Sequence, residues 1–348
     1  MTNRRSALVL AVEIFILLAI VVFLAGSART KVTISNRICL GTACSITVYG
    51  NASKAKSAIG KAWDAVTELE NHISVNLPYS EVSLANAIAG SGQWLEISEQ
   101  TYELVDFAIR MSDKTSGAMN PALGSLIAMW GIGTDDARVP EKAELDAALA
   151  SAKVENILLE CREDMCFIQI TDASTVLNLG AVGKGWAADV AAKVLSSCGI
   201  ENALLDFGGN IYALGKFPTT FGARDFSIGL QDPDQYRGMN FSVVSVHNLS
   251  VVTSGSYERF FEGPDGHRYS HIIDPSTGWS IENDIQSVSI IGPSSAVCDA
   301  MSTSFFILGP EGAASVLQDG FDGYFAVFLL GNGADRHVVQ VGSDGILE

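Results

Sequence analysis

The sequence predicts a mixed α+β fold, with helices and largely antiparallel strands in one large domain. Three observations support this class. Of the 348 residues, 48% are apolar and 18% are charged, so the chain can bury a sizeable core. Helical spacing is mixed with short alternating runs, and many of the strand-like runs fall between residues 203 and 291. No repeat and no low-complexity linker divides the chain, so we expect residues 31–348 to form one domain.

The first thirty residues form a segment distinct from the body of the chain. From Ala7 to Gly26 the chain has 20 residues with one charge, Glu13, and a helix of that length spans about 30 Å, the thickness of a bilayer core. Arg4 and Arg5 precede this run, which predicts an N-terminus inside and a body outside. We therefore predict that residues 1–30 anchor the chain in the cytoplasmic membrane, with the body on the periplasmic side.

A cleaved signal peptide is the alternative for the same segment. The small residues from Ala25 to Ala28 would suit a cleavage site. The apolar run is long for a signal peptide, which favours an uncleaved anchor.

In the body, each element is predicted from its periodicity and its end signals. Pro140 fits the first turn of a helix, and Gly199 fits the position just after a helix end. Helices are expected over 53–73, from Ser98 through Met111, from Pro140 to Ala152, and over 184–197, 294–308 and 310–317. Strands are expected as a pair over 31–49 around Gly41, over 157–159, 167–170, 203–206, 226–230 and 241–246, in a hairpin around Gly263, and twice near the C-terminus.

Six cysteines, at positions 39, 44, 161, 166, 198 and 298, allow disulfides in a body outside the cytoplasm. Cys161 and Cys166 flank a predicted turn, so a bridge between them is one option, although spacing alone does not settle the pairing. No CxxC pair occurs, and we do not expect a thiolate zinc site.

The charge balance bears on partners. Lys and Arg number 22 against 39 Asp and Glu, which gives a net charge of −17. Such a chain repels phosphate backbones, so we expect no nucleic acid among its partners.

The segment from Leu177 to Trp186 reads as a strand, a glycine turn and a helix. The free N–H groups of a helix start favour a phosphate, and Lys184 adds a full positive charge. The glycines match neither the Walker A loop nor the dinucleotide fingerprint. An ordinary strand-to-helix turn is the competing interpretation.

Asp299 and Thr303 lie four residues apart on a predicted helix, so both oxygens project from one face. A carboxylate and a hydroxyl suit a hard cation such as Mg²⁺. An Asp near a helix start is often only a cap, but Asp299 lies inside an apolar stretch, where a buried carboxylate needs a partner.

Two further segments are rich in Gly and polar residues. The Gly208-Gly209 pair after Asp206 permits close backbone approach or forms a simple turn. His271 and Asp274 lie three residues apart before a Pro-Ser-Thr-Gly turn, where they form either an acid/base pair or an ordered hairpin end.

In order along the chain, these segments resemble the ApbE family of FAD:protein FMN transferases. The match covers residues 38–330, and the ordered set is highly specific although each piece is weak alone. It comprises Gly41-Thr42, Ser80-Glu81-Val82-Ser83 with Asn86, Ser116 to Gly124 with Trp130-Gly131, Leu179-Gly180-Ala181, Lys184-Gly185, Asp206 with Gly208-Gly209, Thr253-Ser254-Gly255, His271 to Pro275 with Thr277-Gly278, and Asp299-Ala300 with Thr303.

The resemblance implies an ApbE-like, T-fold-related domain with one combined site. It implies Mg²⁺ held by the Asp299 carboxylate, the Thr303 hydroxyl and the backbone oxygen of Ala181, and it makes His271 the candidate general base. The residues implied to bind FAD are Leu40, Asn76, Ala118, Met119, Asn120, Asn178, Lys184 and Ile273.

Three of these residues depart from the family pattern. Asn178 stands where the family usually has Asp, and Asn120 where it often has Asp, so each swap removes a negative charge and keeps an acceptor oxygen. Asn76 stands where many members carry a Tyr near the flavin, and losing that ring should weaken retention of FAD.

The implied activity is Mg²⁺-dependent transfer of FMN from FAD to a Ser or Thr hydroxyl of a partner protein, with release of AMP. The implied partners are FAD and a flavin-bearing subunit of a membrane electron-transfer complex. Two alternatives stay open: a protein that only holds FAD, and a pyrophosphatase in which water replaces the hydroxyl and yields FMN and AMP.

Overall fold

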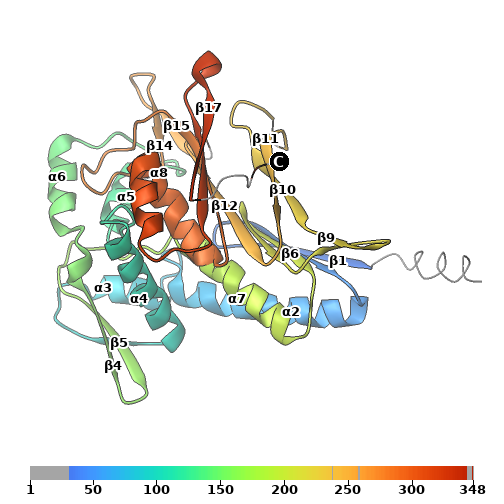
Figure 1. Cartoon of the computed structure of the whole chain (residues 1–348). Helices are drawn as coiled ribbons and strands as arrows, with labels where there is room; N and C mark the ends of the chain where they lie inside the picture. The colour runs from blue at the N-terminus through green and yellow to red at the C-terminus, as the bar shows by residue number, and fades with distance from the viewer. Residues whose placement is uncertain (1–30, 237, 258, 343–346, 348) are drawn as a thin grey trace, which may run out of the picture.

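A computed structural model describes residues 31–348 except 237, 258, 343–346 and 348. Its centre is an eight-stranded sheet in the order β1-β2-β6-β7-β12-β15-β16-β17, and every neighbouring pair is antiparallel (Figure 1). These strands are Val32–Cys39, Thr42–Tyr49, Ala203–Phe207, Asn210–Leu214, Leu249–Gly255, Ile285–Gly292, Phe325–Leu330 and His337–Val341. The predicted class, mixed α+β with largely antiparallel strands, is confirmed.

Both faces of this sheet are buried in its middle. Successive side chains of a strand point to opposite faces, and neighbouring residues of β12 and β16 accordingly join different cores. Val252 and Phe328 pack with helices α2, α7 and α8, whereas Val251 and Val327 pack against the hairpin of β10 (Phe226–Gln231) and β11 (Asn240–Val246). The sheet is therefore the middle layer between helices and a second, two-stranded layer.

Helices α2 (Ala52–Ile73), α7 (Gly183–Ser197) and α8 (Ser295–Gln318) cover the first face, close to their predicted bounds. Asn51 begins α2 by accepting hydrogen bonds from the N–H groups of Ser53 and Lys54, which satisfies two donors that a helix start leaves open. Gly309 has non-helical backbone angles and is followed by Pro310, so α8 bends there, where the sequence predicts two helices.

A smaller group of elements lies beside the end of these helices (Figure 1). It consists of α3 (Glu81–Ala87), α4 (Glu99–Lys114), α5 (Gly124–Trp130), α6 (Lys142–Ser151), a 3-10 turn (Val154–Asn156) and the sheet β3-β5-β4 (Leu95–Ile97, Met165–Ile170, Ile157–Arg162). Cys161 and Cys166 pair across β4 and β5 and form a disulfide, which settles that option.

One helix boundary differs from expectation. Pro140 is not in the first turn of α6, because Glu141 is the N-cap and the helix begins at Lys142. The Glu144 carboxylate accepts a hydrogen bond from the Glu141 N–H at 2.8 Å, and this reciprocal cap fixes the start.

The remaining elements are short. Two hairpins, β8 (Phe217–Thr219) with β9 (Gly222–Arg224) and β13 (Phe260–Glu262) with β14 (Arg268–Ser270), and a 3-10 turn (Gly333–Asp335) complete the chain. Among the described residues, no helix combines the length and apolar character that crossing a bilayer requires. The predicted anchor, residues 1–30, lies outside the described residues.

Candidate functional site

The N-terminus of α7 packs directly against the first turns of α8. Gly185 makes this approach feasible, because a Cβ at that position would overlap the backbone carbonyl of Ser295. Asp189, one turn further along α7, accepts hydrogen bonds from the Ser294 hydroxyl (2.7 Å), the Ser295 N–H (2.8 Å) and the Ala296 N–H (3.0 Å). A carboxylate of α7 thus satisfies the open donors at the start of α8 and fixes one helix on the other.

The Asp299 carboxylate is the buried charge at this contact, with 3% of the residue exposed. Its Oδ1 lies 3.2 Å from the Lys184 ammonium, and its Oδ2 accepts a hydrogen bond of 2.9 Å from the Gly185 N–H. Burying a carboxylate is costly unless it is paired. The partners here are a cation and a free amide of a helix start, so the predicted need for a partner is confirmed, and Asp299 is not a cap, because Ser294 caps α8.

The residues predicted to hold Mg²⁺ lie on these same elements. Thr303 follows Asp299 by one turn of α8, and Ala181 belongs to the turn that leads into α7. A carboxylate, a hydroxyl and a carbonyl are the oxygen donors that a hard cation takes. Among the described residues, no group of three or more His, Cys, Asp or Glu side chains forms a metal centre, and the predicted set needs none. The donor chemistry fits Mg²⁺, with Lys184 as the cation that it would displace.

His271 is half-buried just after β14. Its Nδ1 lies 3.1 Å from the Arg259 carbonyl oxygen, which can only accept, so Nδ1 carries the proton and Nε2 is left with a lone pair. Burial first, and then the Arg259 and Lys184 charges, lower the pKa of His271 to about 4 against the opposing Arg259 hydrogen bond. The imidazole is therefore neutral near pH 7 and lies within the electrostatic reach of Lys184.

Asp274 has a structural role rather than pairing with His271. Its Oδ1 accepts hydrogen bonds from the N–H and the hydroxyl of Ser276, at 2.8 Å and 2.7 Å. The ordered-turn interpretation of this segment is the one that applies. Ile273 is buried in a satellite core with Leu123 and Trp130, and its backbone bridges to Ser280.

The turn after α4 holds three of the predicted flavin residues. Ala118 and Met119 are buried, and the Met119 N–H donates to the Thr115 hydroxyl at 3.1 Å. The Asn120 amide donates to the Ala152 carbonyl (3.0 Å) and accepts from the Ala122 N–H (2.8 Å). Both ends of the Asn120 amide thus stabilise the turn.

Asn178 lies in the segment that leads into α7. The strand predicted at the start of this segment does not form, because only Val176 makes an isolated bridge, to Leu123. The Asn178 N–H donates to the Pro121 carbonyl, which joins the segment before α7 to the turn after α4, and the Asn178 side chain accepts from the Gly180 N–H at 2.8 Å. Gly183 at the start of α7 faces the Ile73 side chain at the end of α2.

The end of α2 also holds the β1–β2 turn. Leu40 occupies that turn with a φ of 51°, and its N–H donates to Glu70 of α2 at 2.7 Å. Asn76 lies in an exposed turn just beyond α2.

Three contributors were not predicted from the sequence: Asp189, Glu70 and the Arg259 carbonyl. Asp189 had a signal, because it is the one acidic residue of a helix otherwise made mostly of small and apolar residues. Glu70 and Arg259 are ordinary surface-type residues in the sequence, and only the fold brings them to Leu40 and His271.

Comparisons with known proteins show which proteins this chain is similar to. The sequence pattern of the ApbE family matches residues 40–328. A protein of Treponema pallidum (strain Nichols) named FAD:protein FMN transferase is 36% identical over 314 residues, which are 87% of this chain and 86% of that protein. One of Klebsiella pneumoniae (strain 342) with the same name is 31% identical and matches 80% of this chain and 84% of its own.

Solved structures give the same result. The ApbE protein of Thermotoga maritima superposes with a TM-score of 0.78 at 26% identity, over 89% of this chain and 97% of its own. The flavin transferase ApbE of Vibrio cholerae superposes with a TM-score of 0.75 at 26% identity, over 90% and 98%.

Proposed function

The chain belongs to the ApbE family, and from this premise we propose that it transfers FMN from FAD to a Ser or Thr hydroxyl of a partner protein and releases AMP. The observation that carries the proposal is the junction of α7 and α8. The start of α7 carries the positive end of the helix dipole and the Lys184 ammonium, a combination that binds phosphate. Lys184 and the Gly185 N–H both contact the buried Asp299 carboxylate of α8.

In the proposed reaction the acceptor oxygen attacks the FMN phosphorus. The bond between that phosphorus and the bridging oxygen breaks, and AMP leaves with the bridging oxygen. The proton of the attacking hydroxyl passes to Nε2 of His271, which is unprotonated because Nδ1 donates to the Arg259 carbonyl. Lys184 orients the pyrophosphate and offsets its charge.

Mg²⁺ fits the same junction. Asp299, Thr303 and the backbone oxygen of Ala181 would hold it, and it would supply charge neutralisation at the pyrophosphate. Lys184 has the freedom to change partner, because it reaches Asp299 through a long, partly exposed side chain.

Mass spectrometry of a candidate acceptor incubated with the protein, FAD and Mg²⁺ tests the function. The acceptor should gain the mass of FMN less one water while AMP appears in equal amount. AMP and FMN released without acceptor would instead identify a pyrophosphatase. Yellow protein with no turnover would identify an FAD-holding protein.

We also propose that residues 1–30 anchor the chain with its body on the periplasmic side, and that its acceptor is a subunit of a membrane electron-transfer complex. The apolar run after Arg4 and Arg5 supports the topology. A reporter that is active only after export, fused behind Glu348, should be active. Activity of a reporter that works only in the cytoplasm would contradict the topology.

A further inference from the structure

In one stretch of this acidic protein every charged residue is basic. Residues 31–63 contain five Lys or Arg residues and no Asp or Glu, although the whole chain has a net charge of −17. The five are Lys31, Arg37, Lys54, Lys56 and Lys61. This stretch comprises β1, β2 and the first half of α2. A surface of this sign attracts anions, whereas the rest of the molecule repels them.

The fold gathers part of this stretch at one end of the molecule. The Gly50 N–H donates to the Lys31 carbonyl at 2.8 Å, so the chain enters β1 next to the point where β2 ends and α2 begins. Lys54 and Lys56 are exposed in the first turn and a half of α2. In Figure 1 the starts of β1 and α2 lie at the right of the molecule, at the same end as β9.

The hairpin of β8 and β9 adds an exposed aromatic ring to this end. Thr219 pairs with Gly222, so Thr220 and Phe221 form the tip of the hairpin. Phe221 is 89% exposed. The Phe217 ring lies 5.3 Å from that of Tyr49, which pairs with Val32 across β1 and β2. The hairpin is thereby docked on the entry point of the chain, with its apolar tip in solvent.

The short stretch of chain between the predicted membrane segment and β1 limits how far this end can lie from the bilayer. The predicted membrane segment ends at Gly26, and five residues, 27–31, separate it from Val32. Five residues span at most about 17 Å when fully extended. If residues 7–26 cross a bilayer, the start of β1 must lie within that distance of the hydrocarbon.

We propose that this membrane-facing end, defined as Lys31, Val32, Lys54, Lys56 and Phe221, rests on the bilayer surface. Phe221 inserts between headgroups, as exposed aromatic side chains do at membrane interfaces. The lysines lie near anionic lipid phosphates. The inference rests on the predicted anchor and not on the flavin chemistry. Its test measures contact with lipid, so it can fail while the proposed transferase activity holds.

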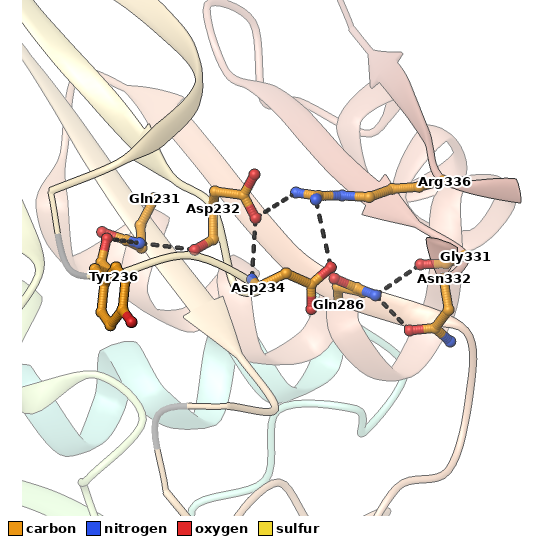
Figure 2. Close-up of polar contacts among 8 residues, drawn as sticks. All are labelled: Gln231, Asp232, Asp234, Tyr236, Gln286, Gly331, Asn332 and Arg336. Carbon is orange, nitrogen blue, oxygen red and sulfur yellow. Dashed lines mark hydrogen bonds and ion pairs between the residues drawn. The ribbon is translucent and has the colours of Figure 1, made fainter. Parts of the chain in front are cut away.

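Two exposed side chains away from this end offer matched controls. Tyr236 is also 89% exposed, but it lies beyond the far end of β10, about 20 Å along that strand from the β8–β9 hairpin. Figure 2 shows how its loop is held: Arg336, just before β17, pairs with Asp232 at 2.7 Å and with Asp234 at 3.4 Å. Ile38, 85% exposed, lies six residues along β1 from Val32 and tests whether the strand stands away from the surface.

The experiment places tryptophan at these positions in the full chain, reconstituted in phosphatidylcholine and phosphatidylglycerol vesicles with brominated acyl chains. Interfacial side chains lie about 5–10 Å into the headgroup and acyl boundary, where bromine quenches them, so the added emission of Phe221→Trp should fall by about half. Tyr236→Trp and Ile38→Trp should keep nearly all of theirs. Wild-type protein, with its five tryptophans, provides the baseline.

Several outcomes would overturn the proposal. Unquenched emission from Phe221→Trp would mean that this end faces water, a second copy or the acceptor protein. Equal quenching at all three positions would show that no one end of the molecule faces the bilayer. Loss of the chain from the vesicles would show that residues 1–30 do not anchor it, which removes the premise of the proposal. The paired change Lys54→Glu and Lys56→Glu should reduce the quenching of Phe221→Trp in anionic vesicles and not in neutral ones, whereas Lys142→Glu, in α6, should not.

Discussion

The Lys184 ammonium lies 3.2 Å from the Asp299 carboxylate although 115 residues separate the two in the chain. The pair joins the start of α7 to the second turn of α8. Two predicted functions, phosphate binding by one segment and cation binding by the other, are thus brought to a single place.

Replacing Asp299 with Ala should lower Mg²⁺-dependent turnover by at least about 10²-fold, because metal charge stabilisation is worth several kcal/mol. The change removes the only full negative charge of the predicted ligand set. Steady-state rates across a Mg²⁺ titration would measure the loss. Asp319→Ala, which removes an exposed carboxylate at the other end of α8, should have no such effect. A wild-type rate for Asp299→Ala at limiting Mg²⁺ would show that Asp299 is not a ligand.

His271→Ala should lower the transfer rate by at least about 10²-fold, the lower end of what a positioned base contributes. FAD affinity, followed by flavin fluorescence, should stay within about threefold, because the proposed role concerns the acceptor proton. Equal losses in rate and affinity would make His271 a binding residue, and no loss in either would remove it from the site.

The pH profile gives a separate prediction for His271. Burial lowers its pKa to about 4, so protonation costs more in the folded enzyme than in water. As the pH falls, the free base should persist through the usual titration range of histidine, and kcat/KM should decline only near pH 4, since that ratio reports the free enzyme. An acidic limb centred near the ordinary histidine value of about 6.5 would contradict this environment.

Gly185→Ala should destabilise the fold by about 1–3 kcal/mol, as overpacking of a close contact does. Its Cβ would overlap the Ser295 carbonyl and push α8 away from α7. Gly183→Ala, two residues earlier, is the matched control, because its Cβ would meet its nearest neighbour at an ordinary 3.5 Å. Urea unfolding of both variants would compare them, and equal stability would disprove the tight contact.

Asp189→Ala should cost about 1–3 kcal/mol of unfolding free energy, because it strips the acceptor from buried donors at the start of α8. Asp146→Ala, which breaks only an exposed pair with Lys142, should stay within about 0.5 kcal/mol. The same unfolding assay applies. Equal losses for the two variants would remove the special role of Asp189.

Local rules predicted local structure well here. Gly41 marked the β1–β2 turn, Ser98 capped α4, and Gly309-Pro310 divided α8, because each depends on residues within a few positions. A buried Asp299 could also be inferred from its apolar neighbours in the sequence. Which groups neutralise it could not, because Lys184 and Gly185 reach it only through helix packing.

The same limit applies to the side chains at the site. The family resemblance implies that Asn120 binds the flavin, and that stays a prediction. Its amide bonds Ala152 and Ala122 in the structure, and no local pattern in the sequence predicts those two partners. The sequence does not predict how basic His271 is. Its low pKa arises from burial and from charges that lie elsewhere in the chain.

Strand β1 and helix α2 together fix the distance between the membrane-facing end and the turn at Leu40. From Val32 to Leu40 the strand advances about 26 Å, and from Ala52 to Glu70 the helix advances about 27 Å. Both run from the membrane-facing end to the turn where the Leu40 N–H meets Glu70. With that end on the bilayer, a substrate hydroxyl lying flush with the lipid headgroups would be out of reach. In that orientation an acceptor would have to raise its modified residue on a domain or loop that stands about as tall as the hairpin, and this distance would select partners by their elevation above the membrane.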